Sequence, residues 1–256
     1  MKDGKKRAVI IGTSTGIGQA LARKLSVEGY VVGLAGRSMK RLRELQKELP
    51  GESHIRVVDL LDTRQAIHEL GNLIMEMREI DLLVINAGVL HHNPDLRWDR
   101  EEETLRVNAV GFAAMANVGV RYFLQRKQGC IVGISSVAGH RGSGRSPAYN
   151  ATKAFMMNYM EGLRQRLCGT GVRVVDIRPG FVDTDMIRGR KGLFGVASTA
   201  QAADGIFRAI QKNKRIAYVP FWWAVLMWFF KRVPESLYHW GYRSYTAWDG
   251  QPPKSS

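Results

Sequence analysis

The sequence has little cysteine and little proline, and each shortage excludes a class of protein. Cys130 and Cys168 are its two cysteines among 256 residues, too few for the disulfide framework of a small secreted domain. Eight prolines leave no long proline-rich linker. With 45% hydrophobic and 24% charged residues, the composition is that of a globular protein, not a disordered one. We therefore expect a sizeable core in a reducing, cytoplasmic compartment.

Long hydrophobic runs are also missing. The chain begins with a basic segment, but the apolar run behind it, residues 8–11, is far too short for the core of a signal peptide. No stretch approaches the roughly 20 consecutive apolar residues that a membrane-spanning helix needs. We therefore expect neither a cleaved leader nor a membrane span.

Acidic residues are scarce relative to basic ones. The chain carries 38 Lys and Arg against 23 Asp and Glu, for a net charge of +15. Residues 187–256 hold about half of this excess on about a quarter of the chain. Such a surface suits nucleic acid, anionic lipid or an anionic ligand, and an ordinary solvated basic face fits equally. We expect no nucleic-acid partner, because no recognition module is present and the aromatic residues do not interleave with basic ones.

Short apolar segments alternate with amphipathic ones along most of the chain. Continuous apolar strands separated by helices predict a parallel sheet that is covered on both faces. Strands are expected over residues 7–11, 31–35, 55–59, 82–85, 130–135, 172–177 and 216–219. Helices are expected over residues 17–28, 39–49, 63–77, 102–126, 148–169 and 199–212. One such series predicts a single α/β, doubly wound Rossmann domain over residues 1–220, followed by an apolar, aromatic helical extension over residues 221–256.

A glycine-rich turn joins the first strand to the first helix, with the spacing G-x-x-x-G-x-G. Its glycines permit a tight turn, a close approach of a pyrophosphate to the backbone, and close packing of helix on strand. The N-terminus of the helix then faces the phosphates. Glycines at such a turn are sometimes purely structural, but the strand–turn–helix context favours a dinucleotide site. Its candidate residues are Gly12, Thr13, Ser14, Thr15, Gly16, Ile17 and Gly18.

The end of the second strand indicates which dinucleotide binds. NAD-binding proteins usually carry a carboxylate there, about 20 residues beyond the turn, that holds the ribose hydroxyl. Residues 34–38 contain no acidic residue. Arg37 can instead clamp a 2′-phosphate through its guanidinium, with Ser38 as a further donor. We therefore expect NADP(H) in preference to NAD(H); the alternative is that Arg37 is a solvated loop arginine.

Tyr149 and Lys153 form a Y-x-x-x-K pair on an expected helix. A spacing of four places both side chains on one helix face. A tyrosine with its ordinary pKa of about 10 is a poor acid–base catalyst at neutral pH, and a nearby ammonium lowers that pKa by stabilising the phenolate. Ser136 follows a strand 13 residues upstream of the tyrosine, where its hydroxyl can bind a substrate oxygen. A surface pair with this spacing is common by chance, so the catalytic interpretation of Tyr149 and Lys153 depends on the serine and on the glycine-rich turn.

Taken together, these motifs resemble a classical short-chain dehydrogenase/reductase. The resemblance covers roughly residues 5–220, and the motifs occur in the order of the family. The matching segments are Gly12-x-x-x-Gly16-Ile17-Gly18, Asp59-Leu60, Asn86-Ala87-Gly88, Asn108, Ile134-Ser135-Ser136, Tyr149-x-x-x-Lys153, and Pro179-Gly180 with Thr184.

The resemblance implies a role for each matching residue. Tyr149 is implied to be the general acid in carbonyl reduction and the base in the reverse direction. Lys153 is implied to tune the tyrosine and to bind the nicotinamide ribose, and Ser136 to orient and polarise the carbonyl. Asn108 is implied to hold a water of a proton relay, with a structural asparagine as the alternative. The other implied cofactor contacts are Asp59, Leu60, Asn86, Ala87, Gly88, Pro179, Gly180, Val182 and Thr184, and no metal site is implied.

Two positions depart from the family pattern. The family often has Thr at the position of Ile11 and Asn at that of Ile85. Those polar groups tie the cofactor loop to the turn after the fourth strand. Their joint loss predicts a looser link between the two loops, but it removes no catalytic atom.

Residues 186–195 and 221–232 bear on the substrate. The first segment has three glycines and suits a mobile lid, whose apolar residues Met186, Ile187, Leu193 and Phe194 face an apolar substrate. Its basic residues Arg188, Arg190 and Lys191 suit an anionic head group or a membrane, with a solvated loop as the alternative.

The second segment is an apolar, aromatic run of ten residues that ends at Lys231 and Arg232. As a helix it spans about 15 Å, half of a hydrocarbon core, and so does not cross a bilayer. It is a peripheral membrane anchor, a wall of the substrate pocket or a subunit contact. In the first case the protein is cytoplasmic and associated with the membrane surface.

The expected activity is NADP(H)-dependent reduction of a carbonyl on a hydrophobic lipid-, sterol- or acyl-like substrate, because every reading of the aromatic segment places an apolar wall near the site. Alternatives are an alcohol-oxidising dehydrogenase of the same family and a non-catalytic NADPH-binding sensor, which has no use for the acid Tyr149. The resemblance also implies a homo-oligomer, dimer or tetramer, through the helices near residues 102–126 and 148–169.

Overall fold

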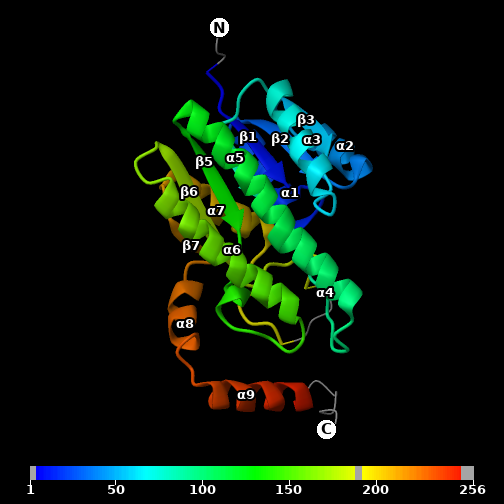
Figure 1. Ribbon diagram of the computed structural model, residues 1–256, viewed down its shortest axis with the longest axis vertical. Helices are drawn as coiled ribbons and strands as arrows, with labels where there is room; N and C mark the ends of the chain where they lie inside the picture. Colours follow the sequence, from blue (N-terminus) through cyan, green and yellow to red (C-terminus); the bar gives the residue numbers. More distant parts are fainter. Residues whose placement is uncertain (1–3, 188–191, 249–256) are drawn as a thin grey trace.

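The computed structural model describes residues 4–187 and 192–248 (Figure 1). Seven parallel strands form one sheet in the order β3-β2-β1-β4-β5-β6-β7. The predicted seven-stranded Rossmann sheet is thereby confirmed. The strands are β1 (Arg7–Ile11), β2 (Val31–Gly36), β3 (Ser53–Val57), β4 (Leu82–Ile85), β5 (Gly129–Ile134), β6 (Val172–Pro179) and β7 (Ile216–Val219). Chain order reverses between β1 and β4, and ligands of such sheets bind at the carboxyl ends of the strands beside that point.

Helices cover both faces of the sheet. They are α1 (Gly16–Val27), α2 (Met39–Glu48), α3 (Thr63–Glu76), α4 (Trp98–Leu105), the π-helical turn η1 (Arg106–Gly111), α5 (Phe112–Arg126), the 3₁₀ turn η2 (Val137–His140), α6 (Pro147–Arg166), α7 (Thr199–Gln211), α8 (Trp223–Phe230) and α9 (Glu235–Trp248). The predicted helical extension after β7 is present as α8 and α9.

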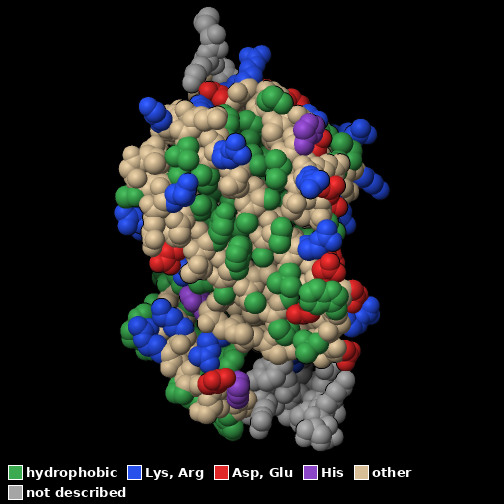
Figure 2. All heavy atoms as spheres, in the orientation of Figure 1, with side chains coloured by type: hydrophobic (Ala, Val, Ile, Leu, Met, Phe, Trp, Pro, Cys, Tyr) green, Lys and Arg blue, Asp and Glu red, His purple; other side chains and the backbone are tan. Residues whose placement is uncertain are grey.

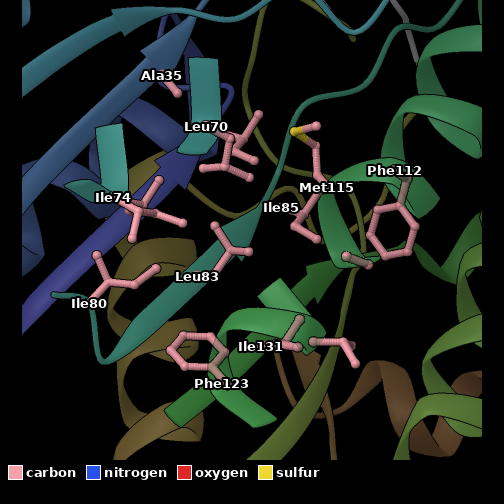
Figure 3. Packing of buried hydrophobic residues seen from close by; sticks show 14 of the residues in the cluster. Ala35, Leu70, Ile74, Ile80, Leu83, Ile85, Phe112, Met115, Phe123 and Ile131 are labelled. Carbon is pink, nitrogen blue, oxygen red and sulfur yellow. The ribbon is translucent and has the colours of Figure 1, made fainter. Parts of the chain in front are cut away.

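Alternation along the strands divides the core into two layers. Leu83 of β4 joins the layer beneath α3 and α5, whereas its neighbour Val84 joins the layer beneath α1 and α7. Successive strand residues point to opposite faces, so an unbroken apolar strand supplies both layers. Figure 3 shows the first layer, where Phe112 and Phe123 of α5 lie over the sheet with Leu70 of α3.

The long helix expected over residues 102–126 begins earlier and is not uniform. It starts at Trp98 and runs through the π-helical turn at residues 106–111 before α5. By length and composition alone, Trp98–Arg126 is apolar enough to cross a membrane, which the search for long apolar runs did not foresee. Half of its apolar window is buried, as in a core helix of a sheet protein.

The third strand also differs from its prediction. It ends at Val57, two residues before the expected end at Asp59. The carboxylate of Asp59 accepts a hydrogen bond from the backbone N–H of Leu61, which stabilises a turn and not a strand. Asp59 therefore lies in the loop beyond the sheet edge, at its carboxyl end.

Candidate active site

The predicted site residues lie in the loops after the strands β1 to β6 and in the helical elements α1, η1 and α6, at the carboxyl end of the sheet. A separate hollow of about 390 Å³ is lined by Lys6, Tyr30, Asp81 and Arg173. These residues lie at the amino ends of the strands, on the opposite edge from the motifs. In the described ranges, no group of three or more His, Cys, Asp or Glu side chains is arranged to hold a metal ion.

The glycine-rich turn forms a cradle that side chains would fill. Gly12 has φ +93°, and a Cβ there would lie 2.6 Å from backbone atoms of Ala87. A Cβ at Gly18 would overlap the carbonyl oxygen of Gly12. The N-cap of α1 is Thr15, whose side chain accepts no capping hydrogen bond, and the first turn contains no acidic residue. The helix N-terminus is thus left to a ligand, and the turn fits a dinucleotide pyrophosphate.

The turn is joined to the loop after β4 by three hydrogen bonds. The Asn86 side-chain amide donates to the carbonyl oxygen of Gly12 at 2.7 Å. The backbone N–H groups of Asn86 and Ala87 both donate to the carbonyl oxygen of Ile11, at 2.9 and 2.8 Å. Asn86 and the backbone therefore join the two loops, and the looser link expected from Ile11 and Ile85 stays a prediction.

The loop after β2 presents its arginine to solvent. The Arg37 side chain is 55% exposed, and its guanidinium lies 3.7 Å from the Glu103 carboxylate of α4. Glu103 also contacts the ring of His91 at 2.9 Å. The Ser38 hydroxyl accepts from the backbone N–H of Arg41 and caps α2, which leaves its proton free to donate. No sequence motif indicates Glu103, since its approach to Arg37 arises from the tertiary fold.

Ser136 follows the end of β5, and Tyr149 and Lys153 lie in the first turns of α6, where Lys153 reaches back to the end of β5. The Ser136 hydroxyl accepts from the backbone N–H of Ala138 at 3.1 Å, so its own proton is free for a ligand. The Lys153 ammonium lies 5.7 Å from the centroid of the Tyr149 ring and donates to the carbonyl oxygen of Ile134 at 2.9 Å. Burial lowers the pKa of Lys153 to about 8, and the negative charge of Asp176 opposes that shift.

Asn108 is completely buried in the π-helical turn. Its amide makes a two-way pair with the backbone of Val89, accepting at 2.8 Å and donating at 2.8 Å. It also donates to the Thr152 hydroxyl at 3.3 Å, which in turn donates to the carbonyl oxygen of Tyr149. Asn108 therefore joins the loop after β4 to helix α6, a contact that fits the structural alternative for this residue.

A chain of polar side chains that sequence analysis missed runs behind Ser136. The Ser135 hydroxyl donates to one oxygen of the fully buried Asp176 carboxylate at 2.5 Å, and Arg178 donates to the other at 2.7 Å. Arg178 also donates to the Tyr218 hydroxyl, which lies 2.9 Å from the ring of His140. The one available signal was the acidic residue Asp176 between two arginines in the otherwise apolar β6.

The chain extends to the turn that follows Ser136. His140 ends η2, and its ring stacks on that of Tyr218 with 5.9 Å between centroids. Burial, with the positive charges of Arg178 and Lys231, lowers the pKa of His140 to about 4. The imidazole is therefore neutral at pH 7 and links the catalytic turn to the last strand.

The Pro179-Gly180 segment lies between the glycine-rich turn and the C-terminal helices. Val182 forms an isolated bridge with Ala197, and a Cβ at Gly16 would lie 3.0 Å from the Thr184 methyl. A Cβ at Gly180 would overlap the indole of Trp223. That indole N–H is buried and has no hydrogen-bond partner within the described part of the chain. Of the predicted lid, Arg188, Arg190 and Lys191 lie outside the described residues.

Comparison with known proteins is consistent with this arrangement. A family model described as short chain dehydrogenase matches residues 6–191. An uncharacterized oxidoreductase of Myxococcus xanthus is 37% identical over 186 residues, which cover 71% of this chain and 74% of that relative. A serine 3-dehydrogenase of Rhizobium radiobacter is 31% identical over 205 residues, which cover 79% and 80% of the two chains.

Solved structures share the fold at lower identity. A mutant actinorhodin polyketide ketoreductase with NADPH matches with a TM-score of 0.73 and 22% identity, over 80% of this chain and 90% of that one. A 3-ketoacyl-(acyl-carrier-protein) reductase from Brucella melitensis complexed with NADH matches with a TM-score of 0.77 and 19% identity, over 83% and 95%. The cofactors differ between the two, so the likeness extends to a nicotinamide-binding fold and does not choose between them.

Proposed function

Because the chain belongs to the short-chain dehydrogenase family, whose members are oxidoreductases acting on CH–OH or C=O groups, we propose that it uses NADP(H) to reduce a carbonyl on a hydrophobic substrate. One observation carries the proposal. The Lys153 ammonium is buried against the Ile134 carbonyl beside the Tyr149 ring, next to a serine whose proton is free. Proton transfer to a carbonyl oxygen requires an acid, a cation that stabilises its conjugate base and a hydrogen-bond donor, and Tyr149, Lys153 and Ser136 fit these three roles.

Each of the three side chains has its own part in the reaction. The Tyr149 hydroxyl donates its proton to the substrate oxygen, and the Lys153 ammonium stabilises the phenolate that remains. A pKa of about 8 leaves Lys153 largely charged at pH 7. The Ser136 hydroxyl donates to the same substrate oxygen and polarises the carbonyl. A nicotinamide cofactor, when bound at the glycine-rich turn, supplies the hydride.

The loop after β2 supports NADP(H) in preference to NAD(H). It offers no carboxylate to a ribose 2′-hydroxyl, and the exposed Arg37 after the second strand is suited to bind a 2′-phosphate. The ion pair with Glu103 is long and exposed, so it binds the guanidinium weakly and gives way to a bidentate phosphate. The remaining predicted contacts, from Asp59 and Leu60 to Thr184, lie around the same carboxyl end of the sheet.

Aromatic side chains support a hydrophobic substrate. Phe181 meets Trp223 edge to face, and Phe194 meets Trp222, at centroid distances of 5.4 and 5.7 Å. These rings follow the Pro179-Gly180 segment, on the side where family members bind substrate. Oxidation of a hydrophobic alcohol, with Tyr149 as the base, is the reverse of the same proposed reaction. We further propose peripheral contact of residues 221–232 with a membrane.

A homo-oligomer is also part of the proposal. Val110, Leu124 and Phe155 are exposed on the face formed by η1, α5 and α6. Figure 2 shows hydrophobic side chains gathered along this face of the molecule. Such a stripe on two long helices is suited to pairing with the same stripe of a second copy. Analytical ultracentrifugation measures the assembly directly.

The reaction is tested by exchanging the proposed acid. We expect Tyr149→Phe to lower turnover of a water-soluble ketone by at least about a hundredfold, because the proton donor is gone. NADPH binding, measured by fluorescence, stays largely intact. Tyr159→Phe on the same helix is the matched control and keeps full turnover. Near-normal turnover in Tyr149→Phe overturns the assignment.

A further inference from the structure

The C-terminal helices pack against the segment that follows the Pro179-Gly180 motif. Trp223 of α8 is buried over Gly180 and edge-on to Phe181. Trp222 contacts Gly195 and the ring of Phe194, at the other end of the lid segment. The inner side of α8 therefore forms a wall beside the lid.

The segment after α8 is attached to the opposite side of the site. The Arg141 guanidinium donates to the carbonyl oxygen of Val233 at 2.8 Å and lies 4.5 Å from the centroid of the Tyr238 ring. The Tyr238 hydroxyl donates to the carbonyl oxygen of Gly142 at 2.6 Å. Arg141 and Gly142 directly follow the turn that begins at Ser136. The C-terminal segment thus bridges both loops that flank the catalytic residues, as the position of α8 and α9 below the sheet in Figure 1 allows.

The outer side of this bridge is apolar and exposed. Phe221, Val225, Trp228 and Phe229 recur at the spacing of one helix face, and Phe221 is 82% exposed. Leu237 and Trp240 continue the exposed apolar surface on α9, and Phe194 of the lid is 75% exposed. A solvated helix carries polar residues on such a face, so this surface, defined as the outer apolar face, is suited to a partner.

Charge identifies the partner as an anionic lipid surface. Lys231 and Arg232 are exposed at the end of α8, and the Arg232 guanidinium lies 3.8 Å from the centroid of the Trp228 ring. Tryptophan beside cations is the composition of a helix that lies in a bilayer interface. Glu235 is the neighbouring acid, and it contacts His239 at 3.6 Å.

A second copy of the chain is the less suitable occupant. A two-fold contact through this face would bring the basic C-terminal regions of two molecules together, and like charges there oppose association. The stripe on η1, α5 and α6 offers a separate surface for pairing.

We propose that the outer apolar face docks on an anionic bilayer and turns the substrate entrance toward the lipid, so that the substrate is a carbonyl compound dissolved in the membrane. This inference rests on the proposed carbonyl reduction for its substrate, but not for its docking surface. The same helix that forms the wall of the site on one side contacts lipid on the other. Substrate then reaches the site without passing through water.

Co-sedimentation with vesicles tests the docking surface. The full chain is compared with Val225→Ser/Phe229→Ser and with the control Val27→Ser/Met75→Ser, whose residues are equally exposed on α1 and α3. Vesicles are phosphatidylcholine, alone or with phosphatidylserine. We expect the full chain and the control to bind phosphatidylserine vesicles, and the α8 variant to bind at least about tenfold more weakly.

Three results overturn the docking proposal. They are an absence of vesicle binding by the full chain, equal binding by the α8 variant, and a loss of oligomer in that variant on size exclusion. Vesicle binding is read without catalysis, so its failure is distinct from a failure of the proposed function. A further arm compares a soluble ketone with a long-chain ketone in vesicles. We expect the α8 variant to have a lower kcat/KM than the full chain for the long-chain ketone only. If the variant and the full chain reduce the long-chain ketone equally fast, the route through lipid is overturned.

Discussion

The side-chain amide of Asn86 lies 2.7 Å from the carbonyl oxygen of Gly12 and adds a third hydrogen bond to the two backbone bonds that join the loops after β4 and β1. Because a Cβ at Gly18 would occupy the space beside the same two groups, the carbonyl, the amide and the helix α1 form one packed unit. The position of the pyrophosphate cradle is therefore set by a residue from another strand.

Asn86→Ala is expected to weaken NADPH binding by about fivefold, since a hydrogen bond of this kind contributes about 1 kcal/mol and the loop that it orders belongs to the proposed cofactor site. Isothermal titration with NADPH measures the change. Asn72→Ala, at a half-buried asparagine of α3 distant in sequence from the turn, serves as the control. Unaltered affinity in Asn86→Ala shows that the two backbone hydrogen bonds to Ile11 position the loop unaided.

Glu103→Gln is expected to raise affinity for NADPH several-fold and to leave affinity for NADH unchanged. The Glu103 carboxylate holds the Arg37 guanidinium at 3.7 Å and repels a phosphate in the same place. Arg37→Ala is the opposite control and lowers NADPH affinity. Equal effects of either change on the two dinucleotides would contradict the placement of the 2′-phosphate at Arg37.

Asp176→Asn is expected to move the alkaline limb of the pH–rate profile to lower pH. Activity falls as pH rises through the pKa of Lys153, since its charge is lost, and the Asp176 carboxylate supports that charge against burial. Without the carboxylate the pKa falls below about 8, so the rate at pH 8 drops more than the rate at pH 6.

Ser135→Ala is the matched variant for this profile. It removes a hydrogen bond to Asp176 and keeps the negative charge, so the alkaline limb stays in place. Asp176→Asn also breaks the buried ion pair with Arg178 and so lowers the free energy of unfolding, which urea unfolding at pH 7 measures separately. If the rate of Asp176→Asn falls by the same factor at every pH, the proposed electrostatic role of Asp176 is wrong.

His140 is expected to make the fold sensitive to acid. Its pKa of about 4 in the folded chain lies below its ordinary 6.5, so the unfolded chain takes up the proton first as pH falls. Stability is therefore lost between about pH 6.5 and 4, by about 1–2 kcal/mol after allowance for partial exposure. In His140→Gln, which keeps a partner for Tyr218, urea unfolding should change less between pH 7 and pH 4.5. If His140→Gln and the unchanged protein lose the same free energy of unfolding between pH 7 and pH 4.5, His140 is not the source of the acid sensitivity.

The sequence predicted those parts of the site that are contained in a few consecutive residues. The glycine-rich turn and the Tyr149–Lys153 spacing depend on local geometry alone, so they are recognised in the sequence. The continuous apolar strands likewise predict a parallel sheet. The contact of Glu103 with Arg37 joins distant segments, so no local pattern marks it.

The π-helical turn around Asn108 was equally hidden. Within this turn the Asn108 side chain is hydrogen-bonded to Val89, but the sequence pattern on both sides of the turn is that of an ordinary helix. The buried acid Asp176 had one visible sign, a charge within an apolar strand, but the partner that neutralises it is revealed only by the fold.

The packing of Trp223 on Gly180 has a consequence for how this catalytic unit diverges and how it is engineered. The indole leaves no room for a side chain at Gly180, and Trp222 restricts Gly195 in the same way. A chimaera that imports the lid of a relative without its C-terminal helices therefore inherits mismatched surfaces. We therefore expect residues 180–187 and 192–195 to be exchanged together with residues 221–240, and substitutions on one side of this contact to select for compensation on the other.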